Sequence, residues 1–141
     1  MSGIRYNTES VWHDETFPFS QAVVEAEGRR VHLTGQVAWT PEFEVVGPND
    51  PRAQTNCAID NIERVLSGLG GRLEDVVSVT MYYVRDEDLE AIQEVRRARF
   101  SLQAGPAVTG VKVAALVDSA LLVELTAIAV IPDRRFIDPT A

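Results

Sequence analysis

Glu124 is the residue whose type and position most suggest chemistry. It interrupts the apolar run Leu121–Ile131, where an unpaired charge would be costly because apolar surroundings disfavour it. A carboxyl group in such surroundings suits a general acid or base near neutral pH. The alternative is an acid that forms hydrogen bonds across a boundary between subunits. Both interpretations require a partner that the strand itself does not supply.

Arg96 is the cation whose position is least typical. The segment around it carries an apolar stripe at spacings of three to four residues, formed by Leu89, Ile92 and Phe100. Arg96 falls within this stripe and Arg99 lies at its edge. Arg96 could therefore reach an anionic ligand or Glu124. Alternatively, its aliphatic stem lies on the core while the charged head reaches water.

Composition limits the classes of partner. The chain has 141 residues, 45% hydrophobic, which fits a single globular domain over residues 1–141. Thirteen Lys and Arg against 21 Asp and Glu leave a net charge of −8, so nucleic acid is not an expected partner. The most apolar stretch, residues 111–131, contains Lys112, Asp118 and Glu124 and is expected to be core and not a membrane span.

Metal and disulfide chemistry find little support. Cys57 is the single cysteine and cannot form a disulfide within the chain. With only His13 and His32 beside it, no zinc-binding spacing exists, and we expect neither a metal nor a cofactor. A reducing, cytoplasmic location fits best, since residues 1–7 lack the apolar segment of a secretory signal.

Hydrophobic periodicity and turn residues predict the order β-β-α-β-α-β-β. Gly28-Arg29 and Asp118-Ser119 each indicate a hairpin. Asp50-Pro51 favours a helix start, and Gly70-Gly71 a helix end. The predicted elements are strands 21–27 and 30–37, a helix from 51 to the Gly70-Gly71 pair, strand 76–84, a helix over about 87–102, and strands 109–117 and 121–131.

The elements predict an α+β fold, a mixed β-sheet with both helices packed on one face. On the strand 121–131, Leu121, Val123 and Leu125 share one side, but Leu122 and Ile128 on the other side are apolar too. A sheet that is apolar on both faces and covered by helices on one needs a second cover. We therefore predict a homo-oligomer in which the bare face meets other subunits.

Six blocks of sequence resemble, in order and spacing, the reactive-intermediate deaminase (Rid, YjgF-type) family. They are Phe19-Ser20-Gln21-Ala22, Thr34-Gly35-Gln36-Val37, Gln54 with Asn61-Ile62, Leu73-Glu74-Asp75-Val76-Val77, Pro106-Ala107, and 123–130. The resemblance covers about residues 17–131 and leaves 132–141 as a C-terminal tail that is disordered or clasps a neighbour. It implies a chorismate-mutase-like subunit, a homotrimer with a central barrel, and ligand pockets between subunits.

The resemblance also implies an activity and a departure from it. Typical members hydrolyse imines or enamines of amino acids without a cofactor, and the family's catalytic glutamate coincides with Glu124. The family's carboxylate-binding arginine, however, is replaced by Val108. Gly110 stands where a cysteine is frequent, whereas Thr109 keeps the small hydroxyl. The chain is thus an atypical member, and hydrolysis of 2-iminopropanoate is in doubt.

Five further positions match the family's pocket, each with a structural alternative. Phe19 matches an aromatic wall or belongs to the core. Thr34 and Gly35 match a hydroxyl and a close backbone approach, or a bend in the strand. Gln93 falls near the pocket or is a solvated helix residue. Trp39 lies in a loop that rims the pocket, where it stacks on a flat ligand or packs on a neighbouring subunit.

Three functions remain open. The first is an atypical imine or enamine deaminase, a hydrolase in which Glu124 activates water. The second is a trimer that binds a small metabolite without turnover, and the third a structural trimer with a vestigial pocket. The sequence does not identify the substrate. An older family label, ribonuclease, finds no support in an acidic chain without paired histidines.

Overall fold

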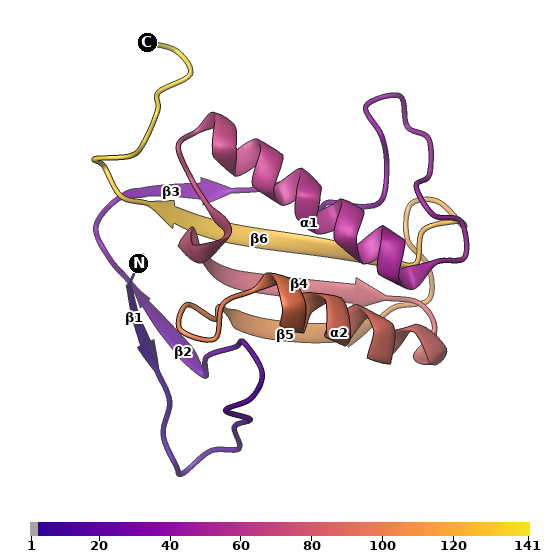
Figure 1. Cartoon of the computed structure of the whole chain (residues 1–141), viewed down its shortest axis with the longest axis horizontal. Helices are drawn as coiled ribbons and strands as arrows, with labels where there is room; N and C mark the ends of the chain where they lie inside the picture. The colour runs from indigo at the N-terminus through magenta and orange to yellow at the C-terminus, as the bar shows by residue number, and fades with distance from the viewer. Residues whose placement is uncertain (1–2) are drawn as a thin grey trace.

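The computed structural model describes residues 3–141 as two β-sheets with two α-helices. The elements are β1 (Gly3–Tyr6), β2 (Ala22–Glu25), β3 (Arg29–His32), α1 (Pro51–Gly68), β4 (Val76–Tyr83), α2 (Leu89–Arg99), β5 (Ala107–Lys112) and β6 (Val123–Ile131), with 3-10 turns at Leu73–Asp75 and Asp86–Asp88. β1 and β2 form a separate two-stranded sheet beside the main one (Figure 1).

The main sheet has the order β3-β6-β4-β5. β3 and β4 both pair antiparallel with β6, whereas β5 pairs parallel with β4. Because β4 and β5 are parallel neighbours, α2 is the crossover that joins them. Both helices lie on one face of the sheet, as Figure 1 shows. The predicted α+β fold with a mixed sheet and one-sided helices is confirmed.

Strand pairing differs from the sequence prediction in three places. β2 pairs with β1, which was not predicted, and β3 pairs with β6, so the hairpin around Gly28 does not form. β5 and β6 are not neighbours either, because β4 lies between them. Gly28 allows the chain to pass closely over the end of β6, since a Cβ there would lie 2.5 Å from the Ile131 carbonyl oxygen. Alternation along a strand shows which side is buried and does not identify the neighbouring strand.

The predicted ends of α1 are confirmed. The side chain of Asp50 accepts a hydrogen bond from the Ala53 N–H at 3.1 Å and so caps the first turn. At the other end Gly70 has φ +81°, the left-handed conformation that stops a helix. Ile62 is fully buried, whereas Val65 on the same helix is 45% exposed.

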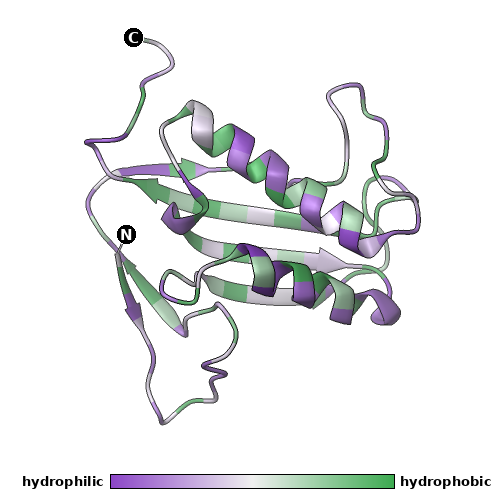
Figure 2. Ribbon diagram, in the orientation of Figure 1, coloured by the Kyte–Doolittle hydropathy of each residue, from purple (hydrophilic) through white to green (hydrophobic). Residues whose placement is uncertain are grey.

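β6 has two different faces. Its helix-covered side is fully buried and is formed by Val123, Leu125, Ala127, Ala129 and Ile131. The opposite side carries Glu124, Thr126 and Ile128, each half-buried, because no helix covers that face. Figure 2 shows the alternation of apolar and polar residues along these strands. The bare face predicted from the sequence is therefore present.

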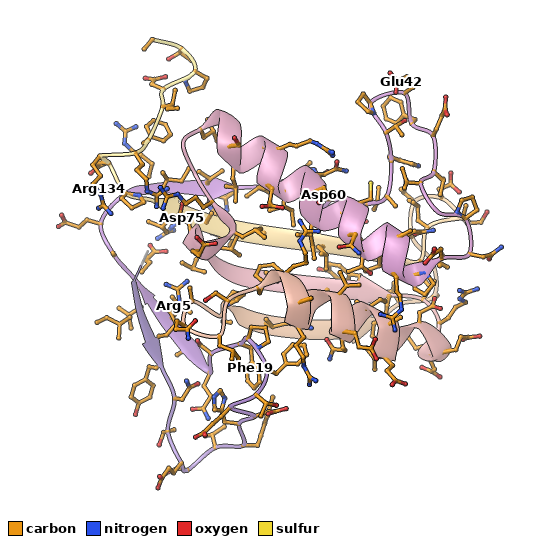
Figure 3. All side chains as sticks on the ribbon, viewed as in Figure 1. Arg5, Phe19, Glu42, Asp60, Asp75 and Arg134 are labelled. Atoms are coloured by element: carbon orange, nitrogen blue, oxygen red, sulfur yellow. The ribbon has the colours of Figure 1, made fainter. Side chains whose placement is uncertain are left out.

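The C-terminal tail contacts its own chain. Arg135 donates to both carboxylate oxygens of Asp75, at 2.9 and 2.6 Å. The Ile137 N–H donates to the Leu69 carbonyl at 2.9 Å, just beyond α1. Arg134, which precedes Arg135 in the chain, is labelled at this end of the sheet in Figure 3. At least as far as Ile137, this tail is held against its own chain and is not a free extension.

Candidate functional site

Four predicted pocket residues meet in one cavity. Phe19 from the N-terminal loop, Gln93 from α2, and Val108 and Gly110 from β5 line a space of about 410 Å³, here called the α2 cavity. Val108 and Gly110 reach it together because alternate residues of a strand share a face. Figure 3 shows Phe19 on the loop below α2. Thr109 points to the bare face, where it pairs with Thr80 and is exposed.

A second set gathers around Glu124. Thr34, Gly35, Trp39 and Glu124 line a cavity of about 970 Å³ beside α1, here called the Glu124 cavity. The side chain of Asn61 on α1 holds the segment between β3 and α1 in place by donating to the Val37 carbonyl at 3.1 Å. The two cavities share no lining residue, so the single chain keeps the two groups of predicted pocket residues apart.

Gly35 and Glu124 lie in direct contact. A Cβ on Gly35 would lie 2.1 Å from Glu124 Oε2, so the carboxylate lies against the backbone and any side chain at this position would displace it. The strand is also interrupted here. Backbone pairing with β6 stops after Leu33, whose N–H meets the Ala127 carbonyl, and resumes at Gln36. The bend predicted here is present, and the close approach at Gly35 is that of the Glu124 carboxylate, whereas an approach to a ligand stays a prediction.

Trp39 forms part of the rim of the Glu124 cavity. Its ring packs edge-on against Phe43, with the centroids 5.4 Å apart. Phe43 is 73% exposed, and the indole Nε1 of Trp39 is buried without a hydrogen-bond partner in the described chain. The loop that carries them projects from the molecule, with Glu42 labelled at its tip in Figure 3. The rim thus presents an exposed aromatic surface.

Arg96 lines the α2 cavity and is 3% exposed. Its Nη1 donates to Gln93 Oε1 and approaches Met81 Sδ at 3.8 Å. The guanidinium carbon lies 5.1 Å from the ring centroid of Phe17, whose loop shields it from water. The expectation that the head reaches water is wrong. Burial lowers the pKa of Arg96 to about 10 because a charged group is disfavoured away from solvent.

Arg99 has a different role from Arg96. It pairs with Asp60 at 2.8 Å and with Glu63, both on α1, and so ties the two helices together. Figure 3 labels Asp60 on α1 above the second helix. Unlike Arg96, Arg99 is therefore directed away from the α2 cavity. Lys112 pairs with Asp86 at the surface.

Sequence reasoning missed the aromatic loop that covers the α2 cavity. Trp12 and Phe17 line the cavity, and both rings lie near Phe19, with centroid distances of 5.8 and 6.4 Å. The Gln21 side chain closes this loop by donating to the carbonyls of Thr8, Val11 and Trp12. The available signal was three aromatic residues within positions 12–19.

Two classes of feature are not found in the described part of the chain. Residues 3–141 contain no group of three or more His, Cys, Asp or Glu side chains arranged to hold a metal ion. No helix among these residues is long and apolar enough to cross a membrane.

Comparison with known proteins places the chain in a sequence context. The model of the family described as Endoribonuclease L-PSP matches residues 13–131. A RutC family protein from Pyrococcus abyssi is 34% identical over 112 residues, which cover 79% of this chain and 85% of the relative.

Solved structures resemble the fold over most of its length. A Rid family protein of unknown function, YyfB from Yersinia pestis, is 34% identical and has a TM-score of 0.85, covering 93% of this chain and 100% of that one. RidA from the Antarctic bacterium Psychrobacter is 30% identical with a TM-score of 0.67, covering 84% and 97%.

Proposed function

Because the chain belongs to the Endoribonuclease L-PSP family, which includes the Rid and YjgF proteins, we propose that it is an atypical imine or enamine deaminase. In this proposal it hydrolyses the C=N bond of a small metabolite in a pocket between subunits, and Glu124 activates the water. No cofactor is needed, because a carboxylate and a water molecule supply every group that the hydrolysis uses. The cytoplasm remains the expected location.

The contact between Glu124 and Gly35 carries the proposal. A half-buried carboxylate lies on bare backbone at a cavity of about 970 Å³ that Thr34 also lines. A carboxylate held this way is accessible to a water molecule and restrained in position, as a general base must be. The family resemblance carries the catalytic role to the same residue.

The proposed reaction balances with these parts. Glu124 accepts a proton from water as the oxygen attacks the imine carbon, and it passes that proton to the nitrogen, which receives the C=N electron pair. The resulting carbinolamine loses ammonia as its C–N bond breaks and the C=O bond forms. In this second step Glu124 takes the hydroxyl proton and transfers it to the departing nitrogen, so the carboxylate is regenerated and the products are a carbonyl compound and ammonia.

The bare sheet face supports assembly into a homotrimer. Family members are typically oligomeric, and the uncovered face carries Ile128 together with Glu124. In a trimer whose sheets line a central barrel, the Glu124 cavity of one subunit would meet the α2 cavity of the next. That arrangement would unite residues that one subunit keeps apart.

The alternative is a trimer that binds a small metabolite without turnover. It is favoured by Val108, which cannot hold a carboxylate as the family's arginine does. On this observation we expect 2-iminopropanoate to be hydrolysed at least about tenfold more slowly than by an arginine-bearing relative. A ribonuclease is not proposed, because the chain carries a net charge of −8 and its two histidines lie on the N-terminal loop and β3.

The decisive experiment compares Glu124→Gln with Glu42→Gln. Imines are generated in solution by an amino-acid oxidase from alanine, leucine and phenylalanine, and their loss is followed by competition with semicarbazide. We expect Glu124→Gln to lower turnover about 100-fold or more with the assembly intact, because a general base is lost. Glu42→Gln changes an exposed carboxylate at the rim and should leave turnover unchanged.

Two results would reject the deaminase. Undiminished turnover by an assembled Glu124→Gln protein would show that this carboxylate does not activate water. Wild-type protein that binds small carboxylates but hydrolyses none of the imines would favour the binding trimer. Light scattering on each variant separates loss of chemistry from loss of assembly.

A further inference from the structure

Arg96 is buried without an acid partner in the described chain. The arginines with a carboxylate within 4.0 Å are Arg29, Arg30, Arg52, Arg85, Arg99 and Arg135. Within residues 3–141 no carboxylate lies that close to Arg96, although it is 3% exposed and its Nε is buried without an acceptor. A buried charge without a counter-ion is strongly unfavourable. The Arg96 guanidinium therefore favours the binding of an anion that residues 3–141 do not supply.

The charges around the α2 cavity also favour an anion. Its charged lining residues are Arg96, Arg97 and Asp14. Asp14 is exposed, and its Oδ1 accepts hydrogen bonds from the Thr16 N–H and hydroxyl at 2.9 and 2.6 Å, so it is already engaged. The cavity therefore has an excess of one positive charge in a chain whose net charge is −8. A monoanion balances it.

The walls of the cavity indicate what accompanies that anion. Trp12 is 81% exposed, which leaves a large apolar surface uncovered at the cavity. Phe17 and Phe19 continue this surface inward to the Arg96 guanidinium. A cavity of about 410 Å³ is larger than a two-carbon or three-carbon acid needs. A flat apolar body beside the anion would cover the rings that a small acid leaves bare.

We propose that Arg96 replaces the arginine missing at Val108 and binds the carboxylate of a substrate whose aromatic side chain packs on the rings of Trp12, Phe17 and Phe19. The planar guanidinium suits a planar carboxylate, with which it forms two parallel hydrogen bonds. The inference rests on the proposed function, which it deepens by naming the substrate class: imines of aromatic amino acids. It concerns binding, so it is tested apart from turnover.

The binding probe is 3-phenylpropanoate, which combines a carboxylate with a phenyl ring and cannot react. Calorimetric titration should detect it on wild-type protein. The neutral amide of the same acid should bind at least tenfold more weakly, because it lacks the charge. Propanoate should also bind more weakly, because it lacks the ring. Tighter binding of phenyl phosphate than of 3-phenylpropanoate would reject the carboxylate assignment.

The matched variants are Arg96→Met and Arg134→Met, which remove the same charge from different places. Arg134 is exposed on the C-terminal tail and lines neither cavity. We expect Arg96→Met to weaken 3-phenylpropanoate at least tenfold, and Arg134→Met to leave it unchanged. Equal affinity of wild type and Arg96→Met would overturn the proposal. Should Arg96→Met fail to fold, Arg96→Lys keeps the charge without the planar fork and should also weaken binding.

Two further results separate this inference from the proposed reaction. If Glu124→Gln creates carboxylate binding that the wild type lacks, Glu124 of a neighbouring subunit is the acid partner of Arg96 and the inference is wrong. If 3-phenylpropanoate binds through Arg96 but the imine of phenylpyruvate is not hydrolysed faster than in buffer, the deaminase proposal fails and the binding site stands.

Discussion

Replacing Gly35 by alanine should separate catalysis from folding. The added Cβ would lie 2.1 Å from Glu124 Oε2, and ordinary contact begins near 3.4 Å, so the carboxylate must retreat by about 1.3 Å. Because the obstructing atom ends a flexible side chain, the fold should accommodate the change with a loss of about 1 kcal/mol or less. A displacement of about 1 Å at a reacting group costs about 100-fold in rate.

The assay measures imine hydrolysis and urea unfolding on the same preparations. Gly68→Ala is the control, since a Cβ there meets nothing within 4 Å. It should leave turnover unchanged and stabilise the helix end slightly. We expect Gly35→Ala to lose about 100-fold in turnover while its unfolding midpoint stays close to wild type. Full activity in Gly35→Ala would refute the reasoning, because it would show that the position of the Glu124 carboxylate does not matter.

Three other outcomes are expected. Arg135→Ala removes the bidentate partner of the Asp75 carboxylate, which is 0% exposed, so urea unfolding should show a free energy of unfolding lower by on the order of 3 kcal/mol. Arg134→Ala, the control, should lower it by almost nothing. Equal effects of the two variants would contradict the role of the tail. Ile128→Asp places a charge on the bare face and should reduce the mass found by light scattering from that of a trimer to that of a monomer, and a stable trimer would mean that this face is not the interface. Burial raises the pKa of the Cys57 thiol, so less of it is thiolate at pH 8 and iodoacetamide should modify it more slowly than free cysteine; an equal rate would count against that burial.

Local patterns were sufficient for the helices and for the faces of the strands. Asp50-Pro51 and Gly70 marked the ends of α1 because capping depends on residues within one turn of the helix. Alternation along β6 separated its buried side from the side that carries Glu124, since side chains of a strand point alternately to opposite faces. Residue types and the family resemblance named part of each cavity, including Phe19, Gln93, Arg96, Val108 and Gly110 in one and Thr34, Gly35, Trp39 and Glu124 in the other. They did not name the aromatic loop.

Tertiary structure alone decided which strands are neighbours and whether the Arg96 guanidinium is buried. β5 and β6 follow one another in sequence, yet β4 lies between them, because strand pairing depends on hydrogen bonds between distant segments. The fate of Arg96 depended on Phe17, far away in the chain, whose loop covers the guanidinium and keeps its head from water. Helical spacing places a side chain on a face, but only the packing of other segments decides whether a long cation stays buried there.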